Sequence, residues 1–356
     1  MELQPVDFFV RDLEGLLDEA RERLARFLGA RPDDLVFVPN ATSGVNTVLR
    51  SLELKRGDEL LVTDHEYNAC RNALEFVAAR RSCKIVVAKL PFPLFSQETV
   101  VERILARVTR KTRLALLDHV TSQTALVLPI AQLVRELDRR SVDVLVDGAH
   151  APGMVGVNLD RLGAAYYTGN CHKWMSAPKG AGFLHVRRDR QRKIRPLVIS
   201  HGANSARRDR SRFLIESAWT GTWDPSAWLA VPEAIRFVGS LSPRGWRAIR
   251  ERNHRLVLAG RIALCEALNI QLPCPDSMIG SIASVQLPKE TSSAPPKSPL
   301  YLDPLQEVLR GEYRIEVPVI PWPKPPHRLV RISAQLYNSL PQYEMLAKAL
   351  PKALGR

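Results

Sequence analysis

The sequence predicts an α/β protein with a large three-layer α/β/α domain around a mostly parallel sheet, and a smaller C-terminal α+β domain. Short apolar runs alternate with amphipathic segments between residues 35 and 186, a pattern typical of right-handed βαβ units. After about residue 235 the alternation stops and proline-rich stretches appear. We therefore expect an N-terminal segment with a helix over 1–30, a large domain over 31–235 and a small domain over 236–356.

The individual elements follow from hydrophobic periodicity. Residues 142–147 form a run of β-branched and aliphatic residues, which is typical of a strand buried on both faces. Apolar residues at helical spacing predict an amphipathic helix over 12–28, closed by Gly29. Further strands are expected over 35–38, 59–63, 84–88 and 114–117, and the C-terminal part should hold a helix over 246–268, an exposed loop over 288–304 and a final helix over 341–354.

The chain is basic, with a net charge of +14. Two arginine-rich segments, 187–195 and 207–212, carry more than half of this excess. Neither contains interleaved aromatic residues, and no nucleic-acid-binding motif is present. We interpret both segments as a solvated basic face and expect no nucleic-acid partner.

Compartment is indicated by what the sequence lacks. No apolar stretch of about 18 residues is present, so no membrane span is expected. The N-terminus has no secretory signal pattern. The five cysteines lack CxxC pairing, which argues for a reducing compartment and against disulfides or a zinc site. We expect a cytoplasmic protein without a metal site.

An acid at the end of a buried strand and a later lysine carry the chemistry. Asp147 ends the run 142–147, where open α/β sheets bind their ligands, and Lys173 lies between a histidine and a tryptophan. Each residue alone is more often structural: such an aspartate forms turns, and such a lysine lies at the surface. Together they indicate pyridoxal phosphate, with the lysine as Schiff base and the acid at the pyridinium nitrogen.

Other polar residues are expected at the same edge of the sheet. The small-residue turn 39–44 leads into a helix, whose free N–H groups can bind phosphate, although the same pattern is typical of an ordinary capped helix. Polar residues follow five predicted strands, and their side chains should gather at the carboxyl edge: Thr42, Tyr67, Ser122, Asp147 and Asn170.

The order and spacing of these motifs resemble the class V aminotransferase family of fold-type-I pyridoxal-phosphate enzymes, in its isopenicillin N epimerase-like branch. The resemblance spans nearly the whole chain. It is carried by the stretches 8–13, 40–42, 64–69, 147–150, 168–174, 219–222 and 331–333.

The resemblance implies a role for each candidate residue. Lys173 would form the Schiff base and, once an amino-acid substrate has formed the external aldimine, abstract its α-proton in an apolar setting. Asp147 would hold the pyridine nitrogen protonated, and Arg331 would bind the substrate carboxylate. The remaining candidates would contact the cofactor: Tyr67 by stacking on the ring, His150 and Ser122 near its phenolate oxygen, and Ala41, Thr42, Asn170 and His172 at the phosphate, with Thr222 reaching the phosphate of a second subunit in a homodimer.

The sequence also departs from this family. Relatives usually begin with a further segment that lines the substrate pocket, so we expect either an incomplete pocket or a misassigned start codon. Trp223 stands where relatives commonly carry an arginine, and Gln123 and Ala125 alter a turn that usually holds proline or glycine.

Three functions remain open from the sequence. The first is epimerisation, racemisation or transamination at the α-carbon of an amino acid. The second is a C–S lyase or cysteine desulfurase, although a persulfide route lacks a mobile cysteine, because Cys274 lies between two prolines and no cysteine follows it before Arg331. The third is a catalytically impaired basic binding protein.

Overall fold

The computed structural model describes residues 2–289 and 303–355, which form two compact units. The large unit comprises the described residues up to Lys89 together with Val101–His119 and Pro129–Trp246. The small unit comprises Leu90–Val100, Val120–Leu128 and the described residues from Arg247 onward. The division at residues 30 and 235 that the sequence favours stays a prediction, and the loop expected over 288–304 lies almost entirely outside the described residues.

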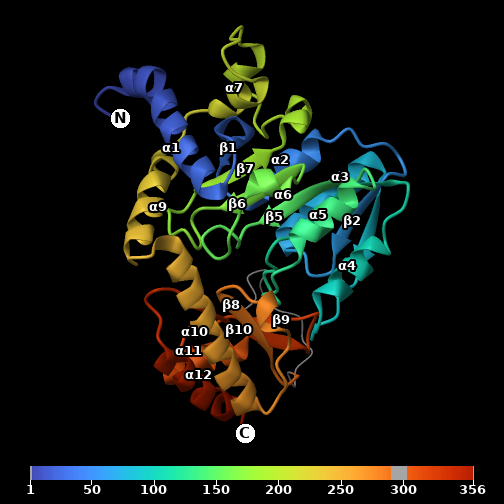
Figure 1. Cartoon of the computed structure of the whole chain (residues 1–356), viewed down its shortest axis with the longest axis vertical. Helices are drawn as coiled ribbons and strands as arrows, with labels where there is room; N and C mark the ends of the chain where they lie inside the picture. Colours follow the sequence, from blue (N-terminus) through green and yellow to red (C-terminus); the bar gives the residue numbers. More distant parts are fainter. Residues whose placement is uncertain (1, 290–302, 356) are drawn as a thin grey trace. The chain divides into compact units, whose positions relative to one another are not determined.

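A seven-stranded sheet forms the centre of the large unit (Figure 1). Its strand order is β1-β7-β6-β5-β4-β2-β3, and only β7 runs antiparallel to its neighbours. The mostly parallel sheet is therefore confirmed. The strands are β1 (Leu35–Val38), β2 (Glu59–Thr63), β3 (Lys84–Ala88), β4 (Thr112–Asp118), β5 (Asp143–Gly148), β6 (Tyr166–Asn170) and β7 (Gly182–Val186).

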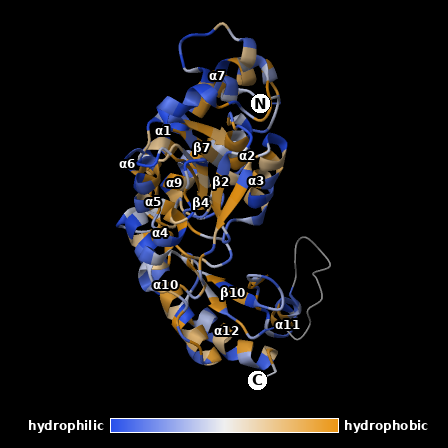
Figure 2. Cartoon of the chain, turned by 90° about the vertical axis from the view of Figure 1, so that its right-hand side faces the viewer, coloured by the Kyte–Doolittle hydropathy of each residue, from blue (hydrophilic) through white to orange (hydrophobic). Residues whose placement is uncertain are grey.

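Apolar strand residues pack against helices on both faces of this sheet. On one face Leu60 and Val62 of β2 join Val45 and Leu74 from two helices in one buried cluster. Leu61 is equally buried but points to the opposite face, since side chains alternate along a strand. Figure 2 shows the strands as mainly hydrophobic, which explains why the sequence presents them as continuous apolar runs.

The helices of the large unit begin with a π-helical turn, η1 (Asp7–Asp12), which the periodicity did not predict, and it runs directly into the expected helix α1. The helices are α1 (Leu13–Leu28), α2 (Ala41–Ser51), α3 (Asn68–Arg81), α4 (Gln97–Leu105), α5 (Ile130–Asp138), α6 (Leu159–Leu162), α7 (Arg212–Ala218), α8 (Ser226–Leu229) and α9 (Val231–Ser240), with 3-10 turns η2 (Pro32–Asp34), η3 (Arg188–Lys193) and η4 (His201–Asn204); the first residues of α4 belong to the small unit.

The small unit contains a three-stranded antiparallel sheet of order β8-β10-β9, so its predicted α+β character is confirmed. Its elements are α10 (Gly245–Leu268), which starts at the end of the large unit, η5 (Asp276–Met278), β8 (Ile282–Gln286), α11 (Pro304–Tyr313), β9 (Val319–Pro321), β10 (Arg328–Ser333) and α12 (Leu340–Ala353).

Acidic residues pair with many of the arginines in the two basic segments. The pairs within hydrogen-bond distance include Arg187–Asp189, Arg190–Asp143, Lys193–Glu53, Arg207–Glu14 and Arg210–Asp18. These contacts neutralise part of the local positive charge. Within the described ranges, no helix is long and apolar enough to cross a membrane.

Candidate active site

Asp147 lies at the carboxyl end of β5, in the middle of the sheet. Its side chain is 3% exposed, and β4 places Asp118 directly beside it in register. One carboxylate oxygen accepts the Ala149 N–H at 2.9 Å, and the other accepts the Cys70 S–H at 3.1 Å. Two fixed donors hold the carboxylate in one orientation, and each oxygen keeps a lone pair for a further donor.

Lys173 lies in the turn that follows β6. Its Nζ is 3.2 Å from Nε2 of His150, and the indole N–H of Trp174 donates to Nδ1 of the same ring at 3.3 Å. Because Nδ1 accepts this bond, a neutral His150 carries its proton on Nε2 and can donate it to an uncharged amine. An uncharged amine is the form that adds to an aldehyde.

The turn that carries Lys173 is held by a close approach of two backbones. Gly153 has a φ of +84°, and a Cβ at this position would lie 2.7 Å from the carbonyl of Trp174. Only glycine fits such a contact without strain. Lys173 itself is exposed in the single chain. The described residues therefore do not enclose it in the apolar setting that the sequence led us to expect.

The first turn of α2 meets the end of β6. Asn40 caps the helix by accepting the Ser43 N–H at 2.9 Å, and Oδ1 of Asn170 accepts the Ala41 N–H at 2.8 Å. The Ala41 N–H and the Asn170 side chain, both expected to contact the phosphate, are therefore hydrogen-bonded to each other. Nδ1 of His172 is buried without a hydrogen-bond partner among the described residues, and burial lowers the pKa of this ring.

The other candidates divide between the two units. In the large unit Tyr67 directly precedes α3 without a side-chain capping bond and is 45% exposed. Thr42 lies in the first turn of α2, and Thr222 is exposed after Gly221. Ser122 and Arg331 both belong to the small unit. There Nη1 of Arg331, on β10, donates to the Ser122 carbonyl at 2.5 Å and lies 3.2 Å from its hydroxyl.

Two further acids, which were not among the candidates expected from the sequence, lie near Asp147. Glu66 and Asp118 are 6% and 2% exposed, and oxygens of both lack hydrogen-bond donors within the part of the chain that the structure describes. Burial, followed by the charges of Asp118 and Asp147, raises the pKa of Glu66 well above its usual range. Burial and the charge of Asp147 also raise the pKa of Asp118 well above its usual range. The nearby charge of Lys173 opposes this shift.

These residues share a site because the strands that carry them are neighbours. Because burial raises the pKa of both Glu66 and Asp118, this pair retains a proton, and Asp147 with its two fixed donors is the carboxylate suited to a basic partner. Asp118 could have been found from the sequence, since it ends a buried strand just as Asp147 does. Glu66 gave no such signal, because it lies in the turn before a helix.

This arrangement fits pyridoxal phosphate. Asp147 would offer a fixed carboxylate to the pyridine nitrogen, and Lys173 would offer a primary amine to the aldehyde. Two groups are suited to an anion. Nδ1 of His172 has no hydrogen-bond partner among the described residues, and the N-terminus of α2 carries the partial positive charge of the helix dipole.

Comparison with known proteins agrees with this chemistry. The model of the family "Aminotransferase class-V" matches residues 9–294. The chain is 38% identical to an isopenicillin N epimerase of Amycolatopsis lactamdurans, over 97% of this chain and 87% of that protein. It is 32% identical to a probable chloroplastic L-cysteine desulfhydrase of Arabidopsis thaliana, over 98% of this chain and 76% of that protein.

Solved structures show the same fold. The apo cysteine desulfurase of Thermococcus onnurineus NA1 superposes with a TM-score of 0.77 at 20% identity, covering 96% of this chain and 84% of its own. A lysine-to-alanine mutant of C-DES, with glycine covalently linked to its PLP cofactor, gives a TM-score of 0.75 at 22% identity, covering 95% of this chain and 86% of its own. The fold, the family match and the two relatives agree: the chain belongs to the class V aminotransferase family and is a pyridoxal-phosphate-dependent enzyme.

Proposed function

We propose that the protein removes and returns the α-proton of an amino acid, as an epimerase or racemase does. The Lys173–His150 contact supports this proposal most directly, because it holds a primary amine within hydrogen-bond distance of an imidazole that can exchange a proton with it. An uncharged amine can act as a general base. The 38% identity to an isopenicillin N epimerase also supports this reaction.

Each residue has a defined task in this reaction. Bound pyridoxal phosphate supplies an electron sink for negative charge at the α-carbon. Asp147 keeps the ring nitrogen protonated, and Cys70 and the Ala149 N–H hold Asp147 in place. Nζ of Lys173 takes the α-proton, and His150 orients that amine.

The substrate carboxylate is assigned to Arg331. A planar guanidinium binds a carboxylate through two parallel N–H bonds, which a lysine cannot do. Ser122 accepts from Arg331 through its carbonyl and so limits the rotation of the guanidinium. We assign Ala41, Thr42, Asn170 and His172 to the phosphate, and Tyr67 to stacking on the cofactor ring.

A second candidate is elimination of sulfur from cysteine. Similarity to an L-cysteine desulfhydrase at 32% identity favours it. Removal of the α-proton would then be followed by loss of the β-thiol group, giving sulfide, pyruvate and ammonia after hydrolysis. A persulfide route is not part of this candidate, because Cys274 is buried beside Arg261, and burial raises the pKa of its thiol to about 11.

We further propose a cytoplasmic homodimer. The five cysteines are free, which suits a reducing compartment. Thr222 is exposed on a loop after Gly221, where a second copy of the chain can reach it. Sedimentation of the loaded enzyme tests the dimer, and a Thr222→Ala variant with weaker cofactor retention would support the shared site.

Incubation of the loaded enzyme with single amino acids in heavy water tests the reaction. Exchange of the α-proton with inversion of configuration supports an epimerase or racemase. Sulfide and pyruvate from cysteine identify the lyase instead, and keto-acid formation that requires an amino acceptor identifies a transaminase. Absence of exchange for every amino acid would refute the proposal.

A further inference from the structure

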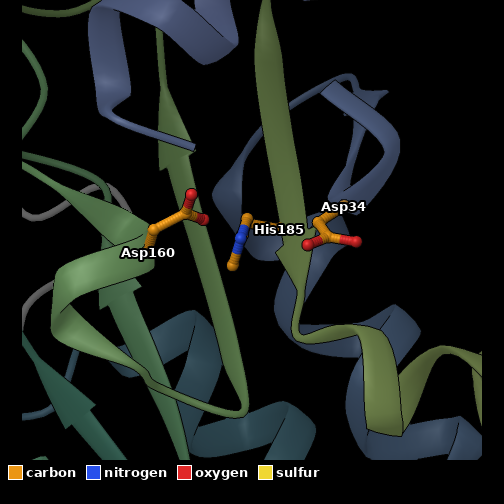
Figure 3. A group of neighbouring side chains, drawn as sticks. All are labelled: Asp34, Asp160 and His185. Carbon is orange, nitrogen blue, oxygen red and sulfur yellow. The ribbon is translucent and has the colours of Figure 1, made fainter. Parts of the chain in front are cut away.

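His185 and two aspartates form a cluster away from the proposed active site. His185 is on β7, Asp34 ends the turn η2, and Asp160 is on the short helix α6 (Figure 3). One nitrogen or oxygen atom from each residue lies within 4.8 Å of the other two. Figure 3 shows the imidazole between the two carboxylates.

The sheet register separates this cluster from Lys173. His185 pairs with Tyr167 near the start of β6, whereas Gly182 pairs with Asn170 at its end. Three residues along a strand span about 10 Å. The cluster therefore lies toward the opposite edge of the sheet from the carboxyl ends and belongs to no step proposed above.

The imidazole of His185 is the unusual member of the cluster. Its side chain is 4% exposed, and within the described ranges neither ring nitrogen has a hydrogen-bond partner. Burial lowers its pKa to about 4, so the ring is neutral at physiological pH and does not form an ion pair with the acids. A buried polar group without a partner is costly, and a bound ion is one of the ordinary ways in which this cost is met.

The carboxylates are placed to complete a ligand set. Gln191 donates to Oδ1 of Asp34 at 2.7 Å and so fixes its orientation, as hydrogen-bond partners of metal ligands commonly do. Asp160 is exposed, but its backbone is anchored, because its N–H donates to the Gly29 carbonyl at 3.0 Å.

We propose that Asp34, Asp160 and His185 bind one divalent transition-metal ion of the zinc type. One imidazole and two carboxylates are a ligand set that zinc accepts, whereas magnesium and calcium prefer oxygen alone. Three protein ligands leave one tetrahedral position for water.

Binding requires a small movement. Bonds of about 2.0–2.2 Å in a tetrahedral site separate the ligand atoms by about 3.4 Å. The exposed Asp160 side chain can turn inward to close the gap. Arg31 and Arg188 lie near Asp34 and oppose a cation, but Arg188 is also 3.9 Å from the carboxylate of Asp33.

The ion would join segments that are far apart in sequence. One metal ion would link three elements: the turn before β1, the end of β7 and the helix α6. Binding should therefore stabilise the large unit. The thermal midpoint should therefore rise with the concentration of the ion, because a ligand that binds only the folded state shifts the unfolding equilibrium.

The test of this site uses the full-length, cofactor-loaded protein. Bound metal is first removed with a chelator, and the binding of Zn²⁺ is then measured. Asp160→Asn is the decisive variant, because Asp160 is exposed and the change should not disturb folding. Asp33→Asn is the matched control, since it removes the same charge from the neighbouring residue of η2 without removing a ligand.

We expect one equivalent of Zn²⁺ in the wild type and in Asp33→Asn, and at least about tenfold weaker binding in Asp160→Asn. Zn²⁺ should raise the thermal midpoint of the first two proteins only, and Co²⁺ should give a tetrahedral visible spectrum that a folded His185→Gln variant lacks. Equal Zn²⁺ affinity in the wild type and Asp160→Asn, or no bound equivalent in the wild type, would overturn the proposal.

Discussion

Replacement of Glu66 by glutamine should change how stability depends on pH. Glu66 and Asp118 are buried beside Asp147, and burial raises the pKa of both carboxyls well above the usual range. In the folded, cofactor-free protein this pair therefore keeps a proton that the unfolded chain releases above about pH 4.3. Since the folded state binds more protons, the free energy of unfolding falls as pH rises.

The size of the effect follows from the number of protons. One retained proton lowers the free energy of unfolding by about 1.4 kcal/mol for each pH unit, up to the raised pKa of the pair. Glutamine removes the Glu66 carboxyl, whose pKa is raised by burial, by Asp118 and by Asp147, and leaves Asp118 as the one acid of the pair that titrates. Between pH 6 and pH 8, the wild type should therefore lose up to about 3 kcal/mol more stability than the Glu66→Gln variant, which is the limit for one retained proton over two pH units.

Urea unfolding of both proteins at pH 6, 7 and 8 measures this difference. Glu75→Gln is the matched control, because Glu75 is on helix α3, which follows the turn that holds Glu66, but is exposed and pairs with Arg71. The control should differ from the wild type by the same amount at each pH. A Glu66→Gln difference that is equally independent of pH would refute the inference that the buried pair retains a proton.

Two further predictions concern the helix at the phosphate site and the small unit. Asn40→Ala removes the cap of α2 and should cost about 0.5–2 kcal/mol of stability, measured by urea unfolding; an unchanged stability would show that the Ser43 N–H finds another acceptor. Arg331→Lys should lower kcat/KM about 10- to 100-fold, chiefly through KM, because a bidentate charged hydrogen bond is lost. An unchanged KM would remove Arg331 from the carboxylate site.

The strands and the positions of their ends were predictable because burial on both faces leaves a simple signature. In the strand that holds Asp147, the three preceding residues, 144–146, are all apolar and buried in the sheet. The end of this strand could therefore be placed from the sequence. The antiparallel direction of β7 was not predictable, because a strand that reverses carries the same apolar residues as one that does not.

The details of the site depend on contacts that sequence spacing does not encode. The bond between Asn170 and the Ala41 N–H joins residues 129 positions apart, and Cys70 reaches Asp147 across 77 positions. The exposure of Lys173 was also not predictable, since apolar neighbours in the sequence do not determine which side chains cover it in the fold. Similarity to a family supplied the roles that were proposed for these residues.

Reduction of the loaded enzyme with borohydride tests the central claim most directly, because it converts the link between cofactor and lysine into a stable bond. Digestion and mass spectrometry then identify the modified lysine. The pyridoxyl group should be found on Lys173, and Lys173→Ala protein should carry none. A pyridoxyl group on any other lysine, or its absence from the wild type, would show that Lys173 does not form the Schiff base.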